Sequence, residues 1–100
     1  MWASVEADTM FVLADILEDM NPEVVGSWLY VRNLADEESR QTTLGKLGIT
    51  NFSFLRQEIE RQCNVQLDES ELPNSSGGSN VTFGQLTKAI AAKRHGYPHG

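Results

Sequence analysis

The chain has 100 residues, of which 40% are apolar, and it carries a formal net charge of -6 with an isoelectric point near 4.7. This length suits one hydrophobic core and is too short for two. The acidic balance argues against a nucleic-acid-binding class, because phosphate binding needs clustered Lys and Arg on one face, and it favours partners with basic surfaces. We therefore predict a single domain over residues 1–100, with its core at about 5–95 and a flexible tail at 96–100.

The cysteine content and the hydropathy pattern set further limits on the class of protein. Cys63 is the one cysteine, so no internal disulfide can form, and a zinc site needs three or four ligands at fixed spacing. No apolar run reaches about 18 residues, and the amino-terminal residues lack the basic start and apolar stretch of a signal peptide. We expect a cytoplasmic protein that binds no metal, no membrane and no nucleic acid.

The first half of the chain predicts one long helix and a second segment that suits a helix or a strand. The first is expected at about residues 5–20, because apolar residues recur at helical spacing along it. Asn21 and Pro22 end this helix and can begin another at about residues 24–34. Trp28 and Tyr30 suit a strand equally well there, and Gly26 weakens a helix. Residues 35–42 are polar enough to form a solvated connection. The apolar stripe of the first helix is Val12, Leu13, Ile16, Leu17 and Met20.

The clearest helix is predicted at about residues 51–63. Its narrow apolar stripe is Phe52, Leu55, Ile59 and Cys63. Phe54 lies on the solvent side, where it is either an ordinary surface hydrophobe or a partner contact beside Ser53. The place of Cys63 on the apolar stripe favours a buried, inert thiol over a nucleophile.

The last helix is predicted from its boundary signals. After residues 73–80, a flexible loop by composition, Thr82 and Gln85 form a capping box. The helix should end near His95, where basic side chains complement the helix dipole. Its apolar side is Phe83, Leu86, Ala89 and Ile90. Together the elements predict an all-α fold, a small bundle of three main helices and one or two short ones with a long first loop.

Several stretches of the second half resemble acyl and peptidyl carrier proteins. They are TTL at 42–44, Leu47-Gly48, the helix end at 59–63 with the exit at 65–69, and VTFGQL at 81–86. The match covers about residues 5–90 in element order, and its sequence-level part is confined to 42–90. The resemblance implies an acyl-carrier-like bundle in which a serine at the start of the second main helix carries 4'-phosphopantetheine. The thiol of that arm holds acyl or aminoacyl groups as thioesters, and a phosphodiester is stabilised at a helix N-terminus.

The attachment motif of the family is altered in this chain. Family members have Asp-Ser-Leu shortly after Leu-Gly, whereas this chain reads LGITNF at 47–52, so an ungapped match puts Asn51 at the serine. Asparagine cannot accept the arm. The distance from Leu-Gly to the helix end is shorter than in the family, which places a gap here and makes Ser53 the preferred attachment residue. From residue type alone, Ser53 is simply a first-turn serine that satisfies a backbone N–H, and either Thr50 or Asn51 is expected to be the N-cap.

The resemblance implies a carrier without catalytic residues. Its expected partners are the phosphopantetheinyl transferase and acyl-transferring or condensing enzymes of a specialised fatty-acid, polyketide or nonribosomal-peptide pathway. The arm would act as a tether that raises the local concentration of the acyl group. A monomer would meet these partners through Phe54, Arg56, Glu58 and Arg61, on a face where Glu58 and Glu60 suit basic surfaces and the two arginines interrupt the acidity.

Two other interpretations remain open at the level of sequence. A carrier fold that has lost its cofactor site would serve as a docking module, which fits Asn51 at the serine position and an exposed Phe54. An unrelated helical bundle could also share the pattern, since short helical domains match by chance. Within residues 21–43, Trp28 and Tyr30 either pack over the core or present a second contact surface.

Overall fold

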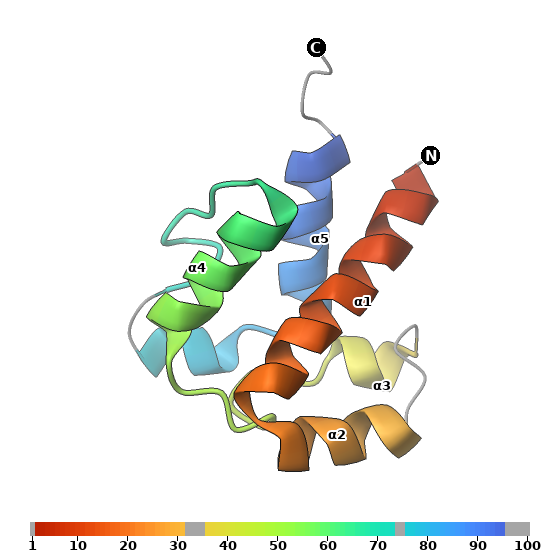
Figure 1. Cartoon of the computed structure of the whole chain (residues 1–100), viewed down its shortest axis with the longest axis vertical. Coiled ribbons are helices and arrows are strands. Elements are labelled where there is room, and N and C mark those ends of the chain that lie inside the picture. The colour runs from red at the N-terminus through yellow and green to blue at the C-terminus, as the bar shows by residue number, and fades with distance from the viewer. Residues whose placement is uncertain (1, 32–35, 74–75, 96–100) are drawn as a thin grey trace.

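The computed structural model describes residues 2–31, 36–73 and 76–95, and these residues form helices joined by turns and loops, with no β-strand among them (Figure 1). The elements are α1 (Trp2–Met20), α2 (Pro22–Val31), α3 (Glu37–Arg40), α4 (Phe52–Cys63), the 3₁₀ helix η1 (Ser76–Asn80) and α5 (Phe83–His95). α1 packs against α2, α4 and α5, and α3 packs against α5. In Figure 1, α1 and α5 run in opposite directions, so the start of α1 and the end of α5 lie at the same end of the bundle. The predicted all-α bundle is confirmed.

The boundaries of α4 and α5 follow their sequence signals. Asn51 is the N-cap of α4, and the helix ends where Asn64 adopts a left-handed conformation with φ 56°. In the capping box of α5, the Thr82 N–H donates to Gln85 Oε1 and the Gln85 N–H donates to Thr82 Oγ1, each at 3.1 Å. Local side-chain chemistry therefore fixes both helix starts, and α5 ends at His95 as predicted.

The segment expected to be a long first loop is more helical than predicted. α2 follows α1 with only Asn21 between them, and the Val25 N–H donates to Asn21 O at 3.0 Å. The helix prevails over a strand because Val25 and Trp28, three residues apart, face the core, whereas Tyr30 is 90% exposed. Residues 32–34 of the predicted helix lie outside the described residues. Trp28 thus packs over the core, and Tyr30 faces solvent.

Two segments predicted as connections are corrected by the structure. Within residues 36–42, expected to be solvated, α3 forms and Ser39 is fully buried. In the loop expected to be flexible, η1 packs so closely on α4 that a Cβ on Gly78 would lie 2.8 Å from the Phe52 ring and 2.9 Å from the Pro73 carbonyl oxygen. In both segments the order comes from tertiary packing. Neighbouring elements cover Ser39, which is polar, and Gly78, which has no side chain, so the local sequence gives no sign of burial.

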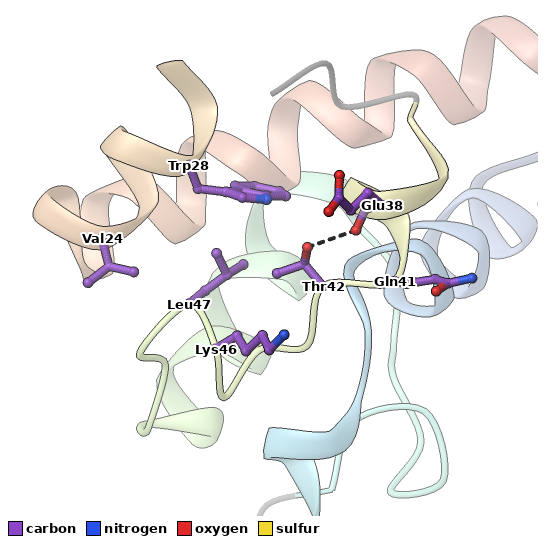
Figure 2. Close-up of a pocket in the computed structure, with 7 residues that line it drawn as sticks. All are labelled: Val24, Trp28, Glu38, Gln41, Thr42, Lys46 and Leu47. Atoms are coloured by element: carbon purple, nitrogen blue, oxygen red, sulfur yellow. Dashed lines mark hydrogen bonds between the residues drawn. The ribbon is translucent and has the colours of Figure 1, made fainter. Parts of the chain in front are cut away.

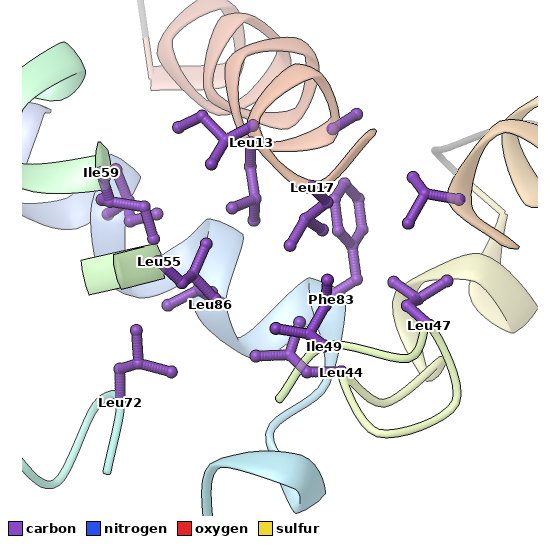
Figure 3. Packing of buried hydrophobic residues seen from close by; sticks show 14 of the residues in the cluster. Leu13, Leu17, Leu44, Leu47, Ile49, Leu55, Ile59, Leu72, Phe83 and Leu86 are labelled. Atoms are coloured by element: carbon purple, nitrogen blue, oxygen red, sulfur yellow. The ribbon is translucent and has the colours of Figure 1, made fainter. Parts of the chain in front are cut away.

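The core gathers apolar side chains from α1, α4, α5 and the segments between them (Figure 3). Phe83 lies near the centre, fully buried, and the Trp28 ring meets it edge to face with centroids 5.1 Å apart. The stripes predicted for the three main helices all contribute. The residues labelled in Figure 3 are Leu13, Leu17, Leu44, Leu47, Ile49, Leu55, Ile59, Leu72, Phe83 and Leu86.

A tight turn carries the chain from the core segment at 42–47 into α4. Gly48 has a φ of 76°, in the left-handed region, and Asn21 Nδ2 donates to the Leu47 carbonyl oxygen at 3.1 Å. The same segment is joined to the start of α5 by an isolated antiparallel bridge between Thr43 and Thr82. The turn therefore sets where α4 begins relative to α1 and α5.

Candidate functional site

The start of α4 is the place at which the sequence predicts a functional site. Of the two expected N-cap residues, Asn51 takes the role, because its Oδ1 accepts a hydrogen bond from the Phe54 N–H at 3.1 Å. Its carbonyl oxygen accepts from the Leu55 N–H at 3.1 Å. Asn51, which an ungapped match places at the family's serine, therefore has a structural role as the N-cap of α4.

Ser53 and Phe54 lie in the first turn of α4 with their side chains outward. Phe52 and Leu55, on either side of them, are buried. Phe54 is 44% exposed, which confirms its expected place on the solvent side, and Ser53 is exposed as well. No hydrogen bond among the described residues uses the N–H groups of Phe52 and Ser53. The turn thus presents a hydroxyl beside two free backbone donors at the positive end of the helix dipole.

Phe54, Glu58 and Arg61 follow one another along the outer face of α4. Arg61 is 68% exposed, and its Nη2 lies 2.6 Å from Glu58 Oε1, which also accepts from Gln62 Nε2 at 3.2 Å. The hydrogen bonds from Arg61 and Gln62 lower the pKa of Glu58, and the bond to Glu58 raises the pKa of Arg61. The face next to Ser53 therefore combines an aromatic ring with a closed ion pair.

Arg56 and Glu60, by contrast, turn toward the segment that follows α4. The Arg56 guanidinium donates to the carbonyl oxygens of Leu67 and Leu72, and its side chain is only 16% exposed. Glu60 Oε2 accepts from the Leu67 N–H at 2.9 Å. These contacts hold residues 67–72 against α4 and leave Arg56 little surface to offer a partner.

Cys63, at the end of α4, is half-buried on the apolar side of the helix. Burial raises the pKa of its thiol, and this outweighs the nearby Arg94 guanidinium, which acts in the opposite direction. A thiol with a raised pKa holds little thiolate near neutral pH, so the expected inert character of Cys63 agrees with its surroundings.

We expect Cys63 in the native protein to react with iodoacetamide about an order of magnitude more slowly at pH 8 than in the urea-unfolded chain, because the native thiol is shielded and less ionised. Since the native pKa is the higher one, the native rate should still be rising at a pH where the rate of the unfolded chain has levelled off. Mass spectrometry over a pH series measures both rates, with Cys63→Ser as the unreactive control. Equal rates for the two states would contradict the partial burial of the thiol.

A pocket of about 360 Å³ lies apart from the α4 start, between α2, α3 and the segment at 42–47 (Figure 2). Sequence reasoning did not find it, because its walls come from three segments whose separate patterns carry no ligand signal. Among its lining residues, the sequence raises a contact surface for Trp28 alone. The lining residues are Val24, Trp28, Glu38, Gln41, Thr42, Lys46 and Leu47.

The described residues hold no group of three or more His, Cys, Asp or Glu side chains able to bind a metal ion. Nor does any helix among residues 2–31, 36–73 and 76–95 combine the length and apolar character needed to cross a bilayer. Comparison with known proteins assigns the chain to no family, since no family model, no curated protein and no solved structure matches it.

Proposed function

We propose that the protein is a carrier that presents acyl or aminoacyl groups on a 4'-phosphopantetheine arm attached to Ser53. The observation that carries this proposal is the exposed Ser53 hydroxyl in the first turn of α4, beside N–H groups of Phe52 and Ser53 that have no other partner. No described residue covers that turn in a way that would bury the hydroxyl.

The residues at this turn suit a phosphodiester. The free N–H groups of Phe52 and Ser53 would donate to its oxygens, and the helix dipole favours its negative charge. Asn51 keeps the helix start fixed through its bond to Phe54 N–H, so the Ser53 hydroxyl has a constant place. When bound, the arm supplies a thiol that holds the carried group as a thioester.

The partner face follows from the exposed side of α4. Phe54 offers an apolar contact next to the attachment residue, and Glu58 with Arg61 adds a closed ion pair further along the helix. Arg56 and Glu60 are engaged with residues 67–72, so their main role is to stabilise the fold. The exposed face of α4 therefore carries fewer free charges than the sequence alone suggests. Its partners would be a phosphopantetheinyl transferase and acyl-transferring or condensing enzymes.

A docking module without cofactor is the second candidate, and one observation favours it. Asn51, which occupies the ungapped serine position, is the N-cap of α4 and cannot carry an arm. Under this alternative the exposed Phe54 ring would be the main contact, and Ser53 would have no chemical role.

The test is intact-protein mass spectrometry after incubation with coenzyme A and a promiscuous phosphopantetheinyl transferase, followed by peptide mapping. We expect one adduct on Ser53, its complete loss in Ser53→Ala, and full loading of Ser70→Ala, a control at another exposed serine. Absence of any adduct on the folded protein rejects the carrier. The docking module would then predict that Phe54→Ala weakens partner binding and that Ser53→Ala leaves it unchanged.

A further inference from the structure

The pocket between α2, α3 and the segment at 42–47 has the size and the walls of a small-molecule site. Its volume of about 360 Å³ falls within the range of about 300–1,000 Å³ that is usual for ligand pockets. One part of the wall is apolar, formed by Val24, Trp28 and Leu47. The rest is polar, formed by Glu38, Gln41, Thr42 and Lys46. A ligand with an apolar body and one polar end would therefore match both the apolar and the polar part of the wall.

Trp28 brings an unmatched donor to this pocket. Its side chain is more than nine-tenths buried, and its Nε1–H has no hydrogen-bond partner among the described residues. Figure 2 shows the indole along one wall of the pocket, with the ring nitrogen on the edge that faces Thr42 and Leu47. A buried donor without an acceptor is unfavourable, and because Nε1 itself has almost no accessible surface, a ligand oxygen satisfies it where the wall opens slightly on binding.

Lys46 is the second unmatched donor. No ion pair of the described residues involves its ammonium, and it is the one cation of the lining. Its own backbone N–H donates to Thr43 Oγ1 at 3.2 Å, which fixes the loop that carries it. The side chain is exposed, so it stands where a ligand would enter.

The other polar groups of the wall are already engaged within the protein. Gln41 Nε2 donates to Glu37 Oε2 at 2.7 Å, and Thr42 Oγ1 donates to the Glu38 carbonyl oxygen at 3.0 Å. In Figure 2 the Glu38 carboxylate and the Lys46 ammonium lie on different sides of the pocket. Repulsion by Glu38 would therefore direct an anionic group of the ligand toward Lys46.

The geometry points to a binding site for a small monocarboxylate with an apolar body. The carboxylate accepts from the Lys46 ammonium and the Trp28 indole N–H, and the body packs on Val24, Leu47 and the indole ring. This site does not depend on the carrier proposal, because none of its residues belongs to the first turn of α4.

The test compares three probes of the same shape: 3-phenylpropionate, its neutral amide and 3-phenylpropylamine. They are titrated to millimolar concentration into ¹⁵N-labelled protein that carries Trp2→Phe, so that Trp28 gives the one indole N–H resonance in the spectrum. We expect the carboxylate to shift this resonance and the amides of residues 41–47, and to bind more tightly than the amide or the amine.

Matched variants locate the charge that holds the carboxylate. Lys46→Met should weaken binding of 3-phenylpropionate about tenfold or more, the loss expected for a charged hydrogen bond. Lys88→Met, which removes an exposed cation from α5 outside the lining, should leave it unchanged. Because Lys46 is exposed, its variant keeps the core intact, and the spectrum reports folding directly.

Three results would overturn the assignment. The first is no shift of the Trp28 resonance with any probe. The second is equal binding of the carboxylate and its amide, or unchanged affinity in Lys46→Met. The third is tighter binding of the amine, since it would mean that Glu38 and not Lys46 selects the ligand.

Discussion

Gly48→Ala should lower the free energy of unfolding by about 2–4 kcal/mol and the melting temperature by about 10–20 °C. Two effects add. An alanine at a φ of 76° is strained, and its Cβ would collide with Asn21 Nδ2. Relief of the collision would displace the Asn21 amide from the Leu47 carbonyl oxygen, and the hydrogen bond between the α1–α2 junction and the turn would be lost. Thermal unfolding followed by circular dichroism measures the change.

Gly26→Ala is the matched control, because it makes the same chemical change in the middle of α2. There the new Cβ would meet only Glu18 Oε2, at an ordinary 3.6 Å, so the higher helix propensity of alanine should stabilise the protein by about 0.4–1 kcal/mol. The double variant Asn21→Ala with Gly48→Ala should lose less than the sum of the single changes, since the collision is then absent. Additive losses would show that Asn21 is not the obstacle.

Arg56→Met should lower the free energy of unfolding by about 2–5 kcal/mol. The guanidinium donates to the carbonyl oxygens of Leu67 and Leu72, two residues that are almost completely buried. Methionine keeps the apolar stem of the side chain but leaves both carbonyl groups without these donors. Urea unfolding measures the loss, and hydrogen exchange should show faster opening of residues 67–72 than of α1.

Arg61→Met serves as the comparison, on the same helix and with the same change of side chain. Arg61 is 68% exposed and paired with Glu58, so its loss should change the unfolding free energy by no more than about 0.5 kcal/mol. Equal effects of the two variants would contradict the structural role of Arg56. The sequence predicted that both arginines contact a partner. Comparing the two variants therefore distinguishes an effect on stability from an effect on partner binding.

The parts of the fold that the sequence predicted correctly are those governed by local chemistry. α4 and α5 carry caps and regular apolar stripes, so their starts and ends follow from residues within a few positions of one another. The exposure of Phe54 followed from the same local rules, which narrowed the N-cap to Thr50 or Asn51, and the structure selects Asn51.

The parts that were missed depend on contacts between distant residues. The EESR sequence of α3 has no apolar side chain, and its helix forms where Arg40 lies close to Gly84 of α5. The inward turn of Arg56 could not be inferred either, because a helical pattern gives the direction of a side chain but not the carbonyl oxygens that lie within its reach. The pocket beside Trp28 has the same origin, since its walls come together only in the folded chain.

Arg94 of α5 bonds to Asp8 Oδ2 and to Thr9 Oγ1, each at 2.9 Å, across almost the whole length of the chain. The α1 residues Leu13 and Leu17, almost completely buried in the finished fold, belong to a helix that packs against α5. During synthesis α1 is made long before α5, and the part of its apolar stripe that α5 covers stays exposed in that interval. The α1–α5 contact can therefore form only after α5 has been made, and until then exposed apolar surface of this kind favours aggregation of the nascent chain.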